Sequence, residues 1–204
     1  MLARGSGPFV AVTLILFFIF MVLRIMFGIT FLIFSIAFLI ILIIFLVFFR
    51  DPKRNIGKGI VAPADGVIRE IKEYDSKVRI STFMNIHNVH VNRTPLDGKV
   101  VSVEYKRGKF KPAYRNDAEN NEQVTTILDT TIGQVKIVQI AGIIARRIVI
   151  YIKNGEDLSK GQRIGIIRFG SRVDVYLPKE KINITVKVGM KVNAGETTVA
   201  DLNV

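Results

Sequence analysis

The stretch Lys160-Gly-Gln-Arg-Ile-Gly-Ile-Ile-Arg-Phe-Gly-Ser-Arg-Val-Asp-Val-Tyr-Leu-Pro178 contains two runs of β-forming residues that meet at Phe169-Gly170-Ser171. Isoleucine, valine and tyrosine dominate both runs, as is typical of strands. Glycine has no Cβ, so the carbonyl of Gly170 can be approached closely and its backbone can adopt strained dihedral angles. The stretch therefore predicts two neighbouring strands, around residues 163–169 and 172–177, with an unusual bond between them.

Short runs rich in valine and isoleucine, separated by Gly, Pro, Asn and Asp, continue this pattern through the chain after Arg50. No amphipathic helical pattern of useful length appears there, apart from a turn or two around residues 140–146. We expect further strands at residues 59–62, 66–71, 77–83, 99–105, 123–128, 134–140, 147–152, 185–188 and 197–202.

A weak internal repeat indicates how these strands connect. Ala62-Pro-Ala-Asp-Gly-Val-Ile and Thr94-Pro-Leu-Asp-Gly-Lys-Val share the same Asp-Gly turn, and glycine supplies the positive φ that a tight hairpin needs. The pattern predicts a mainly β domain of the barrel-sandwich or β-clip type over residues 51–204. By itself it indicates no chemistry.

Residues 8–49 are almost wholly apolar, interrupted by Arg24 and softened by Gly28 and Thr30. A membrane-spanning helix needs roughly 20 apolar residues, which residues 25–49 supply and residues 8–23 barely reach. We expect one membrane helix preceded by a shorter one, as a hairpin or as a shallow pair. Residues 1–50 are thus predicted to be a membrane anchor. A cleaved signal peptide is disfavoured because the apolar region is too long and no small-residue cleavage site follows it.

The 204-residue chain has a formal net charge of +12, and its charges are unevenly placed. All 17 acidic residues follow Arg50, whereas Arg4 and Arg24 are the only basic residues before it. By the positive-inside rule, the basic cluster after the apolar segment places the β domain at the cytoplasmic side of the cell membrane. The same cluster, which includes Lys53 and Arg54, is expected to contact anionic headgroups. Nucleic acid is a disfavoured partner because the charge adjoins a membrane anchor.

The Gly170-Ser171 bond is a candidate for attack by its own serine. An N→O acyl shift would convert the amide into an ester, and elimination would then leave dehydroalanine, which hydrolyses to a pyruvoyl group. A bare Gly-Ser dipeptide usually forms a turn, so this chemistry needs further support. The chain has no cysteine, which excludes disulfides, thiolate zinc sites and cysteine nucleophiles.

The chain has two histidines, His87 and His90. A spacing of three residues suits a metal site on a helix, whereas on a strand it places the side chains on opposite faces and favours two separate roles. A serine nucleophile needs a base, and the base needs an orienting group. Asp65 and Asp97 are both candidates for that group, and the residues alone do not rank them.

Four motifs occur in an order that resembles the short-form phosphatidylserine decarboxylase proenzymes, a family that includes the archaetidylserine decarboxylases. The hydrophobic N-terminal part, which ends in Phe48-Phe49-Arg50-Asp51-Pro52-Lys53-Arg54, is also similar. The visible departure is Ala62, where many relatives have serine. The four motifs are Ala62-Pro-Ala-Asp65-Gly66, His87-Asn-Val-His90-Val-Asn92-Arg93, Ala141-Gly-Ile-Ile-Ala-Arg146-Arg147 and Phe169-Gly170-Ser171-Arg172.

The resemblance implies self-cleavage between Gly170 and Ser171. Ser171 would be the nucleophile, His90 its base, and Asp65 the group that holds the tautomer of His90. Ser171 would become a covalent pyruvoyl group, the one cofactor, with no metal. The two resulting chains would remain together as a heterodimer.

The resemblance also implies the reaction. The pyruvoyl carbonyl would form a Schiff base with the amine of a serine headgroup, and loss of CO2 would yield the ethanolamine lipid. His87 is expected to protonate the carbanion, and Arg146 and Arg147 are expected to bind the lipid phosphate. Phosphatidylserine and archaetidylserine share this headgroup, so both stay open as substrates.

Two other interpretations stay open on the residues alone. In the first, the chain is a non-enzymatic, membrane-anchored barrel-sandwich adaptor whose Gly170-Ser171 bond stays intact. In the second, it is a metallopeptidase with His87 and His90 as metal ligands.

Overall fold

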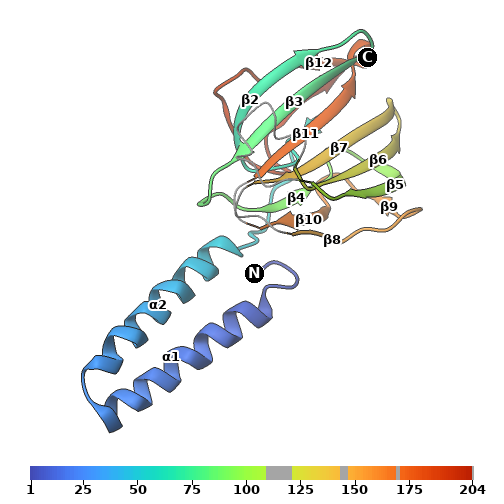
Figure 1. The fold of residues 1–204 in the computed structure, drawn as a ribbon. Coiled ribbons are helices and arrows are strands. Elements are labelled where there is room, and N and C mark those ends of the chain that lie inside the picture. The colour runs from blue at the N-terminus through green and yellow to red at the C-terminus, as the bar shows by residue number, and fades with distance from the viewer. Residues whose placement is uncertain (109–120, 143–146, 169–170, 204) are drawn as a thin grey trace. The chain divides into compact units, whose positions relative to one another are not determined.

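The computed structural model describes residues 1–108, 121–142, 147–168 and 171–203 (Figure 1). The chain divides into two compact units, Met1–Pro52 and Lys53–Val204. The first is helical and the second consists mainly of β-strands.

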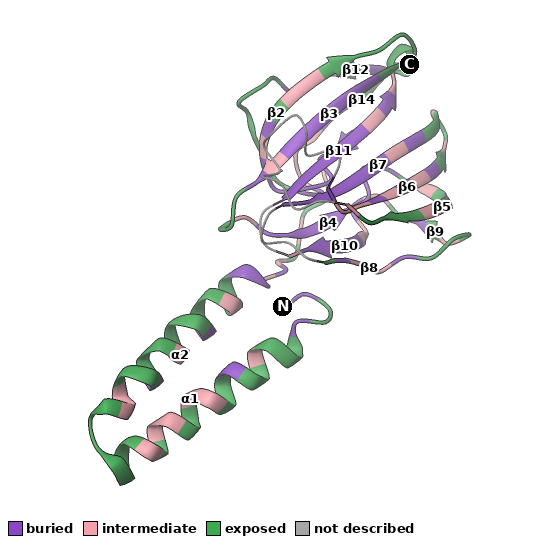
Figure 2. Ribbon diagram, in the orientation of Figure 1, coloured by how far each residue is buried: buried purple, intermediate pink, exposed green. Residues whose placement is uncertain are grey.

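The helical unit is a pair of apolar helices, α1 (Gly7–Phe27) and α2 (Thr30–Phe48). The ring of Phe20 stacks on those of Phe34 and Phe38, with 5.2 Å between centroids in both pairs. Most of the other large apolar residues are exposed (Figure 2). Both helices are long and apolar enough to cross a membrane, and an outward apolar surface of this kind suits lipid. The unit therefore indicates membrane anchoring.

The break between the two helices lies at Gly28, not near Arg24 as the sequence predicted. Gly28 has a φ of 95°, and its N–H donates to the carbonyl of Arg24 at 3.0 Å. Glycine adopts this conformation at little cost, which ends the helix. Arg24 falls in the last turn of α1, where a positive charge favours the helix dipole. The first helix, expected to be the shorter, has 21 residues and the second has 19.

The β unit is built on one large antiparallel sheet with the strand order β13-β2-β3-β11-β7-β6-β5-β9. The sheet curls into a half-barrel (Figure 1). Its central strand, β11, pairs with β3 on one side and with β7 on the other. The bounds of its strands are β2 Gly66–Glu73, β3 Lys77–Met84, β5 Gly98–Lys106, β6 Gln123–Thr130, β7 Gly133–Ala141, β9 Asp157–Leu158, β11 Ser171–Pro178 and β13 Lys191–Val192.

Two three-stranded sheets, in the orders β1-β14-β12 and β4-β10-β8, accompany the large sheet. Their strands are β1 Ile60–Val61, β4 Val91–Arg93, β8 Ile148–Ile150, β10 Arg163–Ile167, β12 Ile182–Ile184 and β14 Thr198–Leu202, and the short 3-10 helix η2 spans Lys179–Lys181.

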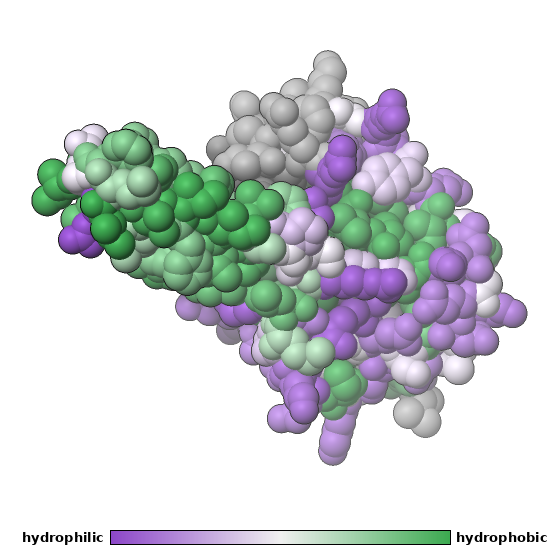
Figure 3. Space-filling view, turned by 90° about the horizontal axis from the view of Figure 1, so that it is seen from below, coloured by the Kyte–Doolittle hydropathy of each residue, from purple (hydrophilic) through white to green (hydrophobic). Residues whose placement is uncertain are grey.

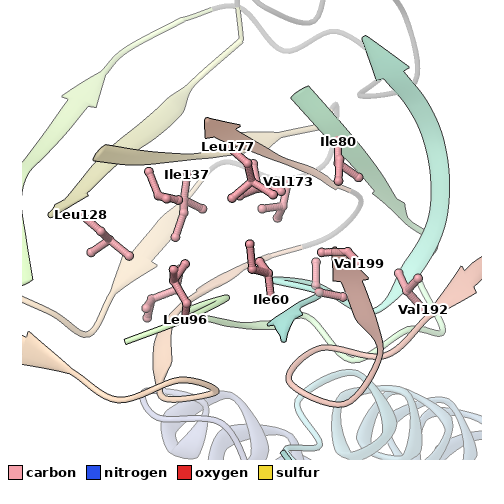
Figure 4. Close-up of a cluster of buried hydrophobic side chains, with 14 of the residues drawn as sticks. Ile60, Ile80, Leu96, Leu128, Ile137, Val173, Leu177, Val192 and Val199 are labelled. Carbon is pink, nitrogen blue, oxygen red and sulfur yellow. The ribbon is translucent and has the colours of Figure 1, made fainter. Parts of the chain in front are cut away.

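The hydrophobic core fills the inside of the curled sheet (Figure 4). Ile137 and Leu177 of the large sheet point toward Ile60 of β1 and Leu96, and burial of such side chains supplies the main driving force for folding. The prediction of a mainly β domain after an apolar helical segment is confirmed in this form, a curled antiparallel half-barrel preceded by two apolar helices.

Some predicted elements differ from those observed. The strand expected at residues 185–188 is absent from the described structure, where β12 has already ended at Ile184. The helical turn expected around residues 140–146 begins in β7, which runs to Ala141, and residues 143–146 lie outside the described residues.

Candidate active site

Ser171 is the first residue of the central strand β11. It lies opposite Met84 of β3 and Ala141 of β7, and its exposed fraction is 0%. The hydroxyl donates to Sδ of Met84 at 3.2 Å. A thioether sulfur is a weak acceptor, so little free energy is lost when this bond breaks.

His90 is fully buried and directly precedes β4. Its Nδ1 lies 2.9 Å from the carbonyl oxygen of Asn88. A carbonyl can only accept a hydrogen bond, so in the neutral ring Nδ1 carries the proton and Nε2 is the basic nitrogen. A tight turn fixes this carbonyl, because the N–H of Asn88 donates to the carbonyl of Asn85 at 2.9 Å.

The described residues on either side of the Gly170-Ser171 bond contact one short segment, Met84–His90. On one side, the N–H of Ile167 donates to the carbonyl of His90 at 3.4 Å. On the other side, Ser171 pairs with Met84. Gly170 itself lies outside the described residues. Ile167 and Ser171, which lie on either side of residues 169–170, are thus both held against the segment that ends in the buried imidazole.

The two candidate aspartates have different surroundings. Asp65 is 6% exposed, and its carboxylate accepts two contacts from Nη2 of Arg54, at 2.9 and 2.8 Å, and one from the N–H of Ala194 at 2.8 Å. Asp97 is exposed and accepts the N–H of Lys160 at 2.8 Å. Asp97 therefore stabilises a surface turn, whereas Asp65 belongs to the buried part of the domain.

The turn that carries Asp65 is attached to the strand next to His90. The N–H of Arg93 in β4 donates to the carbonyl of Pro63 at 2.9 Å, and the N–H of Val61 donates to the carbonyl of Pro95 at 2.9 Å. Since β4 begins directly after His90, these bonds fix the Asp65 turn relative to the histidine backbone.

Arg54 was expected to contact lipid headgroups, and this expectation is wrong. Its side chain is only 9% exposed, because the guanidinium bridges Asp65 and Glu196, whose Oε2 lies 2.9 Å from Nη1. Burial opposes the ionisation of Glu196, but hydrogen bonds from the Arg54 side chain and the Asn55 N–H outweigh this effect and lower its pKa. Arg54, which follows the helical unit closely in the sequence, therefore forms its ion pairs within the β unit.

Comparison with known proteins shows the family of the chain. The family model of phosphatidylserine decarboxylase matches residues 41–200. The chain belongs to the phosphatidylserine decarboxylase family. The predicted family and the predicted class of enzyme, a decarboxylase proenzyme of phospholipid biosynthesis, are therefore confirmed, and the adaptor and metallopeptidase interpretations are set aside.

Individual relatives support this assignment. A phosphatidylserine decarboxylase proenzyme of Streptomyces avermitilis is 50% identical over 154 residues, which cover 74% of this chain and 71% of the relative. That of Thermobifida fusca is 51% identical over 152 residues, with 74% and 70% covered. A Methanosarcina barkeri protein, provisionally named an archaetidylserine decarboxylase proenzyme, is 39% identical over 206 residues and covers 99% of both chains.

The residues expected to act on the lipid in this decarboxylase family lie at the surface where they are described. His87 is exposed in the turn before His90. Arg147 is exposed, and its carbonyl accepts the N–H of Arg168 at 3.4 Å, so the two arginines lie opposite each other. Arg146 lies outside the described residues. Arg168 was missed by the sequence analysis, although it is only two residues before Gly170.

Sequence reasoning also missed the buried amides behind Ser171. Gln139 Nε2 donates to Asn92 Oδ1 at 2.8 Å, and Asn92 Nδ2 donates to Met84 Sδ at 3.6 Å. A signal was present, because Val135, Ile137 and Gln139 occupy alternate positions of one strand. A glutamine at an inward position among apolar residues indicates a buried polar contact.

Proposed function

We propose that this chain is a pyruvoyl-dependent decarboxylase that converts phosphatidylserine or archaetidylserine into the ethanolamine lipid, after cutting itself between Gly170 and Ser171. The observation that carries the proposal is the contact of both flanks of this bond with the segment Met84–His90. That segment brings a buried hydroxyl and a buried imidazole to the described chain on either side of residues 169–170.

Self-processing uses only groups of the chain and one water. His90 Nε2 takes the proton of Ser171 Oγ, which forms a bond to the carbonyl carbon of Gly170, and the amide C–N bond breaks as its nitrogen gains a proton. Removal of the Cα proton of residue 171 then breaks the Cβ–Oγ bond, and the oxygen leaves with the Gly170 carboxylate. The dehydroalanine tautomerises to an imine, which water hydrolyses to a ketone and ammonia.

The surroundings of Ser171 fit the group that this sequence of steps would produce. Oγ departs during elimination and Cβ becomes a methyl group, so the thioether of Met84 would then face an apolar group that suits it better than a hydroxyl. The pairing of Arg172 with Phe83 and Ile140 continues the ladder directly beyond, which would hold the new chain end in place. The pyruvoyl group supplies an electrophilic carbonyl that withdraws electrons from the serine headgroup while CO2 leaves.

We assign the general base of self-processing to His90 and a supporting role to Asp65. Because the carbonyl of Asn88 already accepts from Nδ1, it fixes the tautomer of His90, and Asp65 would act through its negative charge on the protonated ring. The carboxylate has capacity for this role, since among the described residues its Oδ2 accepts one N–H, from Arg54, and a carboxylate oxygen has two lone pairs.

The lipid would meet the exposed His87 and Arg147 and the half-buried Arg168. Arg147 and Arg168 lie opposite each other on neighbouring chain segments, and an anion that contacts both guanidinium groups would be bound by charge-assisted hydrogen bonds. We propose that they bind the lipid phosphate together with Arg146, and that the exposed His87 protonates the carbon that loses CO2.

The two chains produced by the cut would stay associated. The smaller chain would contain β11, β12, β13 and β14. Of these strands, β11 pairs with β3 and β7 of the larger chain, β13 with β2 and β14 with β1, while β12 pairs with β14. A cut before β11 breaks none of these ladders. We further propose that the curled sheet is of the barrel-sandwich or β-clip type, which a solved structure of a close relative would test.

We propose that the β unit lies on the cytoplasmic side of the cell membrane. Arg50, Lys53 and Lys58 follow the apolar helices at once, and the two lysines are exposed, as the positive-inside rule requires of a cytoplasmic flank. Because the chain has no cysteine, a single cysteine placed at Lys58 can be probed with a membrane-impermeant thiol reagent. Labelling in intact cells would contradict this orientation.

The proposed activity is tested with the full chain in vesicles that contain phosphatidylserine, and in parallel with archaetidylserine. The expected result is release of CO2 and formation of the ethanolamine lipid, lost in Ser171→Ala and retained in Ser81→Ala, which removes another buried hydroxyl. Wild-type protein that is folded and membrane-bound but forms neither ethanolamine lipid would contradict the proposal.

A further inference from the structure

Behind the hydroxyl of Ser171 lies a short chain of buried amide groups. Gln139 Nε2 donates to Asn92 Oδ1 at 2.8 Å, and Asn92 Nδ2 donates to Met84 Sδ at 3.6 Å. The same sulfur accepts the hydroxyl of Ser171 at 3.2 Å. The exposed fraction is 0% for Asn92, Met84 and Ser171 and 1% for Gln139. These groups therefore contact one another away from water.

Gln139 determines which way the carboxamide of Asn92 points. Because Oδ1 of Asn92 accepts the Gln139 amide, the NH2 group of Asn92 faces Sδ of Met84, the atom that also accepts the Ser171 hydroxyl. The Gln139 amide packs against Gly165, since a Cβ added at Gly165 would lie 3.2 Å from its Nε2. The Asn92 donor and the reactive hydroxyl thus share one acceptor, the Met84 sulfur.

The present acceptor of this donor is a poor one. Sulfur accepts a hydrogen bond weakly, so a buried N–H gains free energy when an oxygen acceptor replaces it. Such an acceptor arises when Ser171 Oγ loses its proton. The oxygen then changes from donor to acceptor and cannot keep its bond to Met84, which is also an acceptor. Asn92 Nδ2 already contacts the same sulfur.

We propose that Asn92 donates a hydrogen bond to Ser171 Oγ during self-processing, and that Gln139 is the positioning residue for this donor. The inference rests on the proposed function, because it concerns the same bond. In the acyl shift the donor stabilises Oγ as its proton passes to the base and its bond to the Gly170 carbonyl carbon forms. In the elimination it stabilises the electron pair that remains on this oxygen when the Cβ–Oγ bond breaks.

The first test is Asn92→Leu, which keeps the volume of the side chain and removes the donor. The full chain is synthesised in a cell-free system with lipid vesicles, and the fragment that begins at residue 171 is followed by intact mass over time. We expect self-cleavage to slow about 100-fold, the effect of losing one preorganised donor. Thermal unfolding of the uncleaved chain checks that the variant is folded.

Two substitutions at Gln139 separate donor orientation from packing. Gln139→Met keeps the volume without fixing Asn92, and we expect self-cleavage to slow about tenfold at every pH. The carboxyl introduced by Gln139→Glu can donate to Asn92 Oδ1 when protonated, but when ionised it accepts from Nδ2 and turns the donor away from Ser171. The rate of Gln139→Glu relative to wild type should therefore fall about tenfold or more as the pH rises, whereas that of Gln139→Met stays constant.

The outcomes are distinguishable. Wild type that never cleaves would overturn the proposed function itself. Wild type that cleaves, together with a folded Asn92→Leu that cleaves within twofold of it, would overturn the role of Asn92 alone. If Asn92→Leu does not fold, the two Gln139 variants test the inference instead. An equal pH dependence of their self-cleavage rates, each taken relative to wild type, would overturn it. A purely structural role would change thermal stability without this difference in pH dependence.

Discussion

The two faces of strand β11 use buried polar groups in different ways. On the inner face, Ser171 begins a row that continues with apolar residues of the core, and its hydroxyl contacts only a thioether among the described residues. On the outer face, Arg172 and Asp174 form a buried ion pair with 3.0 Å between Nε and Oδ1. One strand thus carries a weakly bonded hydroxyl on one side and a strongly bonded charge pair on the other.

The strength of its partner distinguishes a buried polar group that is available for reaction from one that stabilises the fold. A buried polar group with a strong partner loses much free energy when it leaves that partner, which suits a structural role. The hydroxyl of Ser171 can leave sulfur at little cost and is therefore available for chemistry. The space-filling view shows that polar and apolar side chains also lie in adjacent patches at the surface (Figure 3), but only the buried contacts distinguish these two roles.

The largest effect is expected on the inner side, at His90. His90→Asn removes the proposed base and should slow self-cleavage at least about 1,000-fold, while thermal unfolding shows a folded chain. His87→Asn is the matched control, since His87 lies exposed in the turn just before His90 and its substitution should leave self-cleavage within a few-fold of wild type. Equal loss of self-cleavage in both variants would contradict the assignment of the base.

On the outer side, Arg172→Met should lower stability without removing the chemistry. It leaves the carboxylate of Asp174, only 1% exposed, without its ion pair, and loss of one partner of a buried pair costs about 3–5 kcal/mol. Denaturant unfolding of the Ser171→Ala background measures this cost, and Arg172→Lys should show a smaller one. A cost below about 1 kcal/mol would show that the outer pair resembles a surface pair.

The pH dependence of stability distinguishes Asp174 from Glu196. Burial raises the pKa of Asp174 above its ordinary value of 3.8, although Arg172 opposes this. Protonation of Asp174 therefore favours the folded state at low pH. This contribution to the free energy of unfolding is lost as the pH rises through the raised pKa. The stability of the native chain relative to Asp174→Asn should fall as the pH rises from about 4.

Glu196 provides the opposite sign. Its pKa is lowered from 4.5, so its contribution is present above that pH and is lost as the pH falls through the lowered value. The stability of the native chain relative to Glu196→Gln should therefore decrease on acidification. Thermal unfolding over a pH series measures both variants, and slopes of the same sign would contradict this assignment.

The smallest effect is expected at the end of β11, where the ion pair is exposed. Lys179 Nζ lies 2.6 Å from Glu73, with side-chain exposures of 46% and 59%. Since solvent screens such a pair, Lys179→Met should leave the melting temperature unchanged within error. A loss as large as that of Arg172→Met would show that pairing distance, not burial, determines stability on this face.

The sequence predicted much of this fold because alternating apolar residues identify strands directly. The strands around Ile137 and Val175 were found in this way. By contrast, β4 has only three residues, Val91–Arg93, too few to show a period. The break at Gly28 was misplaced because the charge of Arg24 was taken as the boundary, whereas the backbone conformation of glycine determines it.

The candidate site was predictable only in part. The motifs nominated Ser171, His90 and Asp65 as candidates, and their roles stay predictions, but pairing across distant segments cannot be read from local patterns. The ion pair of Arg54 with Asp65 joins residues from different parts of the domain, and nothing in the basic cluster around Arg54 distinguishes the one buried member. The contact of Ser171 with Met84 depends likewise on the register between β3 and β11.

The most direct test of the account is the intact mass of the purified wild-type protein beside that of Ser171→Ala. The account predicts that wild type yields two chains, the smaller beginning at residue 171 with a blocked N-terminus and a mass below that of its serine form by the difference between serine and pyruvoyl. Ser171→Ala should remain a single chain. A folded, membrane-bound wild type that remains one chain of full mass would contradict the account.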